Sequence, residues 1–144
     1  MRIHRNLVKE GKPLCWEEEL AFSKEDCAQD YPLLSVPKCR FRCKVENEGG
    51  YLTADYSICG EMELADSRNA SPFLEGFSDS ACIDLLESEE EDGEGYIFPG
   101  THFESRDLAH KIIHSLIPIS PHKEGSSLPE GGEGYSFRKE GDER

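Results

Sequence analysis

Two alternating runs of residues, separated by a Gly-Gly turn, constrain the fold of this chain more than any other feature. In the first run, apolar side chains occupy every second position, at Cys39, Phe41, Cys43 and Val45. In the second run, the apolar positions are Leu52, Ala54, Tyr56, Ile58, Met62 and Leu64. A period of two is typical of strands with one buried face, and Gly49 and Gly50 permit the positive φ angles of a tight turn. The pattern predicts an antiparallel hairpin over residues 38–64.

The hairpin also explains the cysteines within it. Cys39 and Cys43 fall on the apolar face of the first strand, where a thiol packs as a small hydrophobic group. The chain has six cysteines but no Cys-x-x-Cys pair, and Cys39 and Cys43 have no second pair at the spacing of a zinc finger. We therefore expect buried free cysteines, no metal site and no cofactor.

Shorter patterns place the remaining strands around the hairpin. Residues 1–10 indicate a short strand or a turn of helix, and the segment CWEEELAFS indicates a strand that places Trp16 near the core. Pro32 and Pro37 mark a connecting loop. Residues 71–86 read as one more, irregular strand, with apolar residues at odd positions: Phe73, Phe77, Ala81, Ile83 and Leu85.

The clearest helix is predicted over residues 105–117. An apolar stripe runs along it, formed by Leu108, Ala109, Ile112, Ile113, Leu116 and Ile117. Ser105 is the expected N-cap, and Pro118 ends the run. The predicted fold class is α+β, a mainly antiparallel β-sheet or partly open barrel with one principal C-terminal helix.

The composition indicates one domain with two solvated segments. At 144 residues the chain is long enough to bury a core, and we assign the domain to residues 1–122. Residues 87–95 form an acidic loop, and because its like charges repel one another we expect it to stay in solvent. Residues 123–144 are rich in glycine and mixed charge, which predicts a flexible polar tail.

The charge balance excludes broad electrostatic binding to nucleic acid. The formal net charge is −14, from 30 acidic residues against 16 Lys and Arg, and such a surface repels phosphate backbones. The N-terminus has no apolar run of signal-peptide length, and no stretch is long and apolar enough to span a membrane. We therefore expect a soluble cytoplasmic protein with no membrane contact.

One local basic face stands against this acidic background. Lys38, Arg40, Arg42 and Lys44 alternate with the apolar residues of the first hairpin strand and so share its opposite face. Two readings stay open. The cations form cross-strand pairs with Asp55, Glu61 and Glu63, or they form a binding patch with Arg68 nearby.

Neither of two candidate catalytic groups has the pattern that its chemistry needs. His110 and His114 are four residues apart on the predicted helix, but position 111 is Lys and not the Glu of a zinc protease, and no third ligand is evident. We expect two solvent-side histidines. Ser67 and Ser71 lack the Gly-x-Ser-x-Gly elbow of a hydrolase. The sequence predicts a protein without catalytic activity.

The order of these parts resembles the YceD family, the large ribosomal RNA subunit accumulation proteins. The likeness extends from MRIHRNLVKEG to about Leu128. It rests on the hairpin with its Gly-Gly turn, the segment GEMELADSRNASPF, the acidic loop, the helix that ends in SLIP and the polar tail.

The chain departs from the family at its cysteines. Where the family carries Cys-x-Arg-Cys followed by Pro and an aromatic residue, this chain has Asp66-Ser67-Arg68-Asn69 and then Pro72-Phe73. No cysteine follows Cys82, so we carry over no metal ligands.

The resemblance implies a non-catalytic factor that supports accumulation of 23S ribosomal RNA and assembly of the large ribosomal subunit. Because the chain is acidic, a basic partner is expected, such as a large-subunit ribosomal protein or a ribosomal RNA processing factor. The alternatives are a protein-binding module unrelated to ribosomes and a weak, direct RNA contact through Lys38, Arg40, Arg42, Lys44 and Arg68.

Overall fold

The predicted hairpin forms the centre of the structure, a computed structural model that describes residues 1–88, 93 and 95–122. Its strands are β3 (Leu33–Glu48) and β4 (Tyr51–Ala65). They pair antiparallel, and the two-residue turn consists of Gly49 and Gly50, whose φ angles are 65° and 95°. Glycine adopts this left-handed conformation without steric cost. The predicted hairpin is confirmed.

One face of the hairpin is fully buried, as the alternation predicts. Every apolar residue expected on that face of β3 and β4 is at most 6% exposed. Gly60 lies on the same face, directly opposite Cys39. A Cβ atom at Gly60 would lie 2.6 Å from the Cβ of Cys39. Glycine therefore interrupts the apolar series at a position where β3 leaves no room for a side chain.

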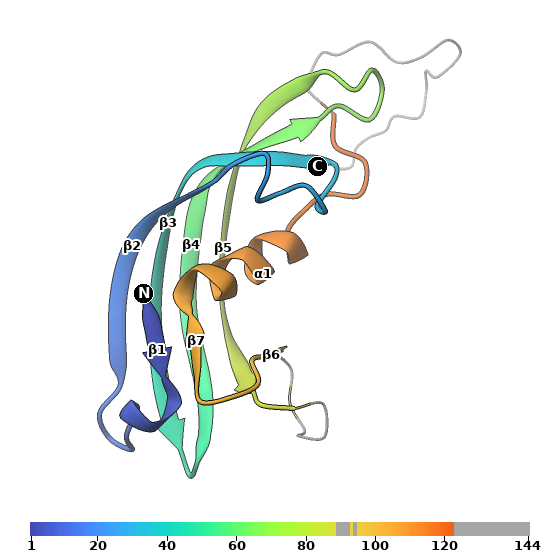
Figure 1. Ribbon diagram of the computed structural model, residues 1–144. Coiled ribbons are helices and arrows are strands. Elements are labelled where there is room, and N and C mark those ends of the chain that lie inside the picture. The colour runs from blue at the N-terminus through green and yellow to red at the C-terminus, as the bar shows by residue number, and fades with distance from the viewer. Residues whose placement is uncertain (89–92, 94, 123–144) are drawn as a thin grey trace.

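Three further strands extend the hairpin into a five-stranded sheet with the order β2-β3-β4-β5-β6. β2 (Leu14–Phe22) pairs antiparallel with β3, and β5 (Pro72–Leu86) pairs antiparallel with β4. β6 (Gly95–Ile97) is parallel to β5 and contacts only its last three residues, Asp84–Leu86. The sheet is long, strongly curved and open at both sides (Figure 1).

The helix and a small strand pair cover one face of this sheet (Figure 1). β1 (Arg2–His4) and β7 (His102–Glu104) pair antiparallel, and a short 3₁₀ turn, η1 (Arg5–Leu7), follows β1. α1 (Ser105–Ser115) continues directly from β7. Its predicted stripe of Leu108, Ala109, Ile112 and Ile113 is completely buried and belongs to the same core as the hairpin. The α+β class with a partly open sheet is confirmed.

Three local predictions are wrong. Ser105 is not the N-cap of α1; it is the first helical residue, its hydroxyl is buried, and it accepts a hydrogen bond from the α-amino group of Met1 at 3.1 Å. The helix ends at Ser115 and not at Ile117, which is only partly buried. Pro37 lies inside β3 and not in a loop. The register with β4 shifts between Ser35 and Lys38, and such a bulge tolerates a residue without an N–H group.

Arg5 anchors the end of β5 and the segment that follows β6. Its guanidinium group donates hydrogen bonds to the carbonyl oxygens of Leu85, Leu86 and Phe98, at 3.1, 2.9 and 2.7 Å. Three carbonyls from two segments are thus fixed by one side chain. This arrangement holds residues 96–99 in place beside α1.

Parts of the predicted organisation fall outside the described residues. These parts are most of the acidic loop at 87–95 and the whole tail at 123–144, so both stay predictions. Within residues 1–88, 93 and 95–122, α1 is the one α-helix, and its 11 residues are too few to cross a lipid bilayer.

The core predicts a strong difference between two isoleucines. Ile112 is fully buried between α1 and the sheet, whereas Ile119 is 97% exposed. Ile112→Ala should lower the free energy of unfolding by roughly 2–5 kcal/mol because it leaves a cavity. The matched control Ile119→Ala should change it by less than about 0.5 kcal/mol. Equilibrium unfolding in urea measures the free energy of unfolding of both variants. Similar decreases for Ile112→Ala and Ile119→Ala would contradict the packing of α1 against the sheet.

The cysteines should divide into two reactivity classes. All six are free thiols; Cys27, Cys39 and Cys43 are buried, and Cys15, Cys59 and Cys82 are exposed. Burial raises the pKa of Cys39 to about 11 and that of Cys43 to about 12, and the thiolate is the reactive form. Thiol labelling followed by mass spectrometry should modify the exposed three first. Modification of Cys39 or Cys43 in the native protein at the same rate would contradict their place in the core.

Candidate functional site

The predicted basic face exists, but every cation on it has an acid directly opposite. Lys38, Arg40, Arg42 and Lys44 lie on the face of β3 that points away from α1. The strand register sets Lys38 against Glu61 and Lys44 against Asp55 of β4, and it sets Arg40 against Glu19 and Arg42 against Glu17 of β2. Directly opposite residues share one face of a sheet. The formal charges of these four pairs therefore cancel.

The two arginines form ion pairs with β2. Arg40 contacts Glu19 at 2.9 Å and Glu17 at 3.4 Å, and Arg42 contacts Glu17 at 3.5 Å. The hydrogen bond to Glu19 and the charges of both glutamates raise the pKa of Arg40. The sequence predicted partners on β4, at Asp55, Glu61 and Glu63. The difference arises because β2 adds to the other side of β3, which the hairpin pattern alone does not show.

The contact of Lys44 is longer than those of Arg40 and Arg42. Lys44 lies 3.9 Å from Glu46 of its own strand. Glu63 accepts a hydrogen bond from Ser35 at 2.9 Å.

Arg68 does not join the basic strand face. It lies in the turn after the end of β4, where its backbone N–H donates to the carboxylate of Asp66 at 2.7 Å. Asn69 accepts from the backbone N–H of Ser71 at 2.9 Å. Asp66 and Asn69 thus shape this turn through hydrogen bonds to the backbone.

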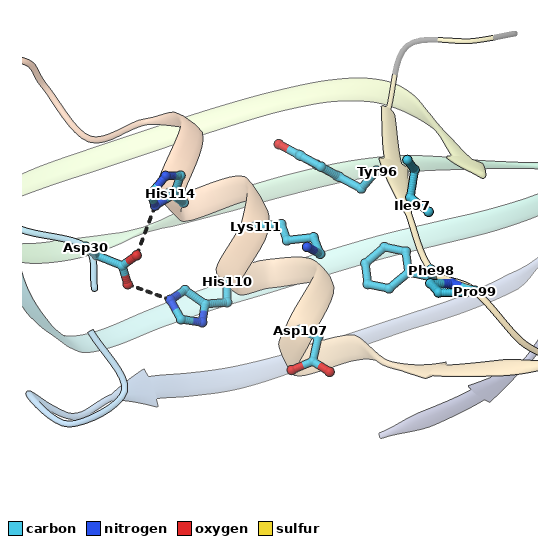
Figure 2. A pocket seen from close by; sticks show the side chains of 9 residues that line it. All are labelled: Asp30, Tyr96, Ile97, Phe98, Pro99, Asp107, His110, Lys111 and His114. Carbon is cyan, nitrogen blue, oxygen red and sulfur yellow. Dashed lines mark hydrogen bonds and ion pairs between the residues drawn. The ribbon is translucent and has the colours of Figure 1, made fainter. Parts of the chain in front are cut away.

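A cluster that the sequence does not reveal lies on the outer side of α1 (Figure 2). His110 and His114, one turn apart on the helix, both contact the carboxylate of Asp30. The distances are 2.7 Å from Nε2 of His110 to Oδ2 and 2.9 Å from Nδ1 of His114 to Oδ1. The prediction of two solvent-side histidines holds only for His114, whose side chain is 63% exposed; that of His110 is 32% exposed.

Asp30 is a buried carboxylate that the two histidines keep charged. Its side chain is only 8% exposed. Burial alone would raise its pKa, but the hydrogen bonds from His110 and His114 outweigh burial, and the pKa of Asp30 is lowered. Each imidazole uses one ring nitrogen as the donor in this arrangement.

A second contact fastens the same loop to the helix. Arg106 bonds to Asp26 at 2.8 Å, and its guanidinium group lies 4.3 Å from the centre of the Phe22 ring. The loop between β2 and β3 is thereby held to α1 at both Asp26 and Asp30. The cluster therefore has an evident structural role.

The outer side of α1 also forms the floor of a groove of about 620 Å³. The Asp30 cluster lies on one side of the helix, and the segment from Tyr96 to Pro99 lies on the other (Figure 2). Lys111 lies between them, with its Nζ atom 5.7 Å from the centre of the Phe98 ring. Aromatic and charged side chains thus meet in one open depression, a composition suited to binding.

Both carboxylate oxygens of Asp30 are engaged by the histidines, and within the part of the chain that the structure describes neither imidazole bonds to a serine or cysteine. Among residues 1–88, 93 and 95–122, no three His, Cys, Asp or Glu side chains converge as metal ligands would.

Comparisons with protein-family models, with curated proteins and with solved structures found no match to this chain.

The Asp30 cluster predicts a pH-dependent contribution to stability. Because its pKa in the folded protein lies below the ordinary value of 3.8, the stabilisation is complete above that value and is lost as the pH falls through the lowered pKa. Asp30→Asn should reduce the free energy of unfolding by roughly 1–3 kcal/mol at neutral pH. The difference from the wild type should shrink in acid.

Urea unfolding at neutral pH and at about pH 3 measures this change. Asp55→Asn, at an exposed position of β4, is the matched control and should have little effect at either pH. If Asp30→Asn lowered the free energy of unfolding equally at both pH values, the result would contradict a charged Asp30 that is hydrogen-bonded to the histidines.

Proposed function

We propose that this chain is a non-catalytic factor that supports accumulation of 23S ribosomal RNA by binding a basic protein of large-subunit assembly. The observation that carries the choice of a protein partner over RNA is the pairing of Arg40 and Arg42 with Glu17 and Glu19. The resemblance to the YceD family supports the choice of pathway.

Electrostatics favours a basic protein as the partner. The formal net charge of −14 repels nucleic acid at long range and attracts cationic surfaces. The face of β3 that carries Lys38, Arg40, Arg42 and Lys44 has an acid opposite each of these cations. An RNA strand approaching that face would have to displace the ion pairs of Arg40 and Arg42, and it would then leave Glu17 and Glu19 near its phosphates.

The side-chain geometry supports a binding role over catalysis. The hydrogen bonds of Asp30 with His110 and His114 hold the loop between β2 and β3 to α1. The groove beside them is lined by aromatic, basic and acidic side chains. A shallow surface of this kind suits contact with a protein, in which aromatic side chains carry much of the affinity.

The pathway is tested in cells depleted of the protein. Depletion should lower 23S ribosomal RNA relative to 16S ribosomal RNA, and expression of the wild type should restore it. An unchanged ratio would contradict the proposed role in the large subunit and would favour a protein-binding module unrelated to ribosomes.

Direct RNA binding is tested with the purified protein and a single-stranded RNA oligonucleotide. We expect no measurable affinity at physiological salt. If Lys38, Arg40, Arg42 and Lys44 contacted phosphates, the affinity would fall with salt on a log–log slope of up to roughly −3. Fluorescence anisotropy across a salt series distinguishes the two results. Such a slope, abolished by replacing those four residues with Gln, would contradict a protein partner as the means of action.

A further inference from the structure

The edge of β5 is an unfilled strand position in the described part of the chain. β6 pairs only with Asp84–Leu86, and among residues 1–88, 93 and 95–122 no other strand or backbone hydrogen bond is present on the outer side of residues 72–83. In Figure 1, β5 borders the sheet, with β6 beside one end only. A long open edge displays unpaired N–H and C=O groups that a further strand can satisfy.

The side chains along this edge define what kind of strand would fit. Glu75, Phe77 and Asp79 alternate on the face of β5 that points toward α1. Phe77 is half-buried, and Glu75 is exposed. Asp79 accepts a hydrogen bond from the Tyr56 hydroxyl at 2.7 Å. Burial, followed by this hydrogen bond, raises the pKa of Tyr56, so the hydroxyl keeps its proton and remains a donor.

The negative charges of this edge are not offset by neighbouring strands. Glu75, Phe77 and Asp79 lie opposite Met62, Gly60 and Ile58 of β4, so none of them faces a cation across the sheet. The other open edge, at β2, differs in this respect. Its Glu17 and Glu19 are already paired with Arg40 and Arg42 of β3. Glu18 of β2 lies opposite Phe41 and accepts a hydrogen bond from Trp16 at 2.9 Å, so β2 has one carboxylate that faces no cation across the sheet, whereas residues 72–83 of β5 have two, Glu75 and Asp79.

From these observations, the geometry points to β5 as a docking edge on which a basic, extended segment of a partner protein adds as a sixth strand. Backbone hydrogen bonds to residues 72–83 supply the affinity common to strand addition. Specificity comes from a basic residue, an apolar residue and a second basic residue at alternate positions, opposite Glu75, Phe77 and Asp79. This inference rests on the proposed function for the class of partner, and it names the site at which that partner binds.

The binding test uses the full-length protein and a synthetic peptide made of two Lys-Thr-Val-Thr-Arg repeats. We expect saturable binding, and in hydrogen–deuterium exchange we expect protection of amides within residues 72–83. Two control peptides separate the contribution of the side-chain order from that of the backbone hydrogen bonds. One has the same composition in scrambled order, and one carries N-methyl groups at alternate peptide bonds and cannot complete the ladder. Both should bind at least about tenfold more weakly.

Two protein variants locate the site. Glu75→Lys places a like charge opposite a basic residue of the peptide and should weaken binding by roughly tenfold. Glu19→Lys is the matched control, since it makes the same charge change on the other open edge, and it should leave binding within about twofold. Circular dichroism establishes that each variant is folded; if Glu75→Lys unfolds, Glu75→Gln replaces it with a smaller expected loss.

Each remaining outcome is decisive. The inference would be overturned if the N-methylated peptide bound as tightly as the unmodified peptide, or if the peptide protected amides outside β5 and not those within it. It would also be overturned if Glu19→Lys weakened peptide binding and Glu75→Lys did not. A concentration-dependent dimer that protects the same amides without peptide would also overturn it, because the occupant would then be a second copy of the chain. If the peptide binds as expected but depletion leaves the ratio of 23S to 16S ribosomal RNA unchanged, the edge is a strand-binding site and the proposed function fails. The two claims therefore fail separately.

Discussion

The burial of one hairpin face beneath α1 is the interaction on which the rest of this structure depends. Phe41 and Ile58 from the two central strands are as inaccessible as Leu108 and Ile112 from the helix, so neither layer is stable as a half-exposed surface without the other. The same contact fixes the rotation of α1. With its apolar stripe against the sheet, His110, Lys111 and His114 necessarily lie toward solvent and the groove.

The sequence reveals those features that repeat over short distances and hides those that join distant segments. The alternation of β3 and β4 and the stripe of α1 are visible because each follows a local period, and burial confirms them. Asp30 is separated from His110 by 80 positions, so no local pattern connects them. The spacing of His110 and His114 indicates that they share a helix face, but it does not show that a carboxylate lies between them.

The charged face of β3 shows the same limit at the level of strand order. Lys38, Arg40, Arg42 and Lys44 are correctly placed on one face by their alternation. Their partners depend on which strand lies on the other side of β3, and the topology supplies β2 with Glu17 and Glu19. A patch that the sequence presents as basic is therefore neutral in the sheet. The acidic excess is left to other surfaces, including the β5 edge, where Glu75 and Asp79 face no cation on β4.

The central claim is that this protein acts by contact with a basic protein along β5 and not by contact with RNA. It is tested most directly by placing a photo-crosslinking amino acid at Ser80, an exposed position of β5, and irradiating living cells that depend on the variant. The same substitution at Cys15, an exposed position of β2 at the opposite edge of the sheet, is the control. We expect a crosslink from position 80, and not from position 15, to a basic protein of the large subunit or its assembly pathway. Crosslinks to RNA from position 80, or equal crosslinking of proteins from both positions, would contradict the claim.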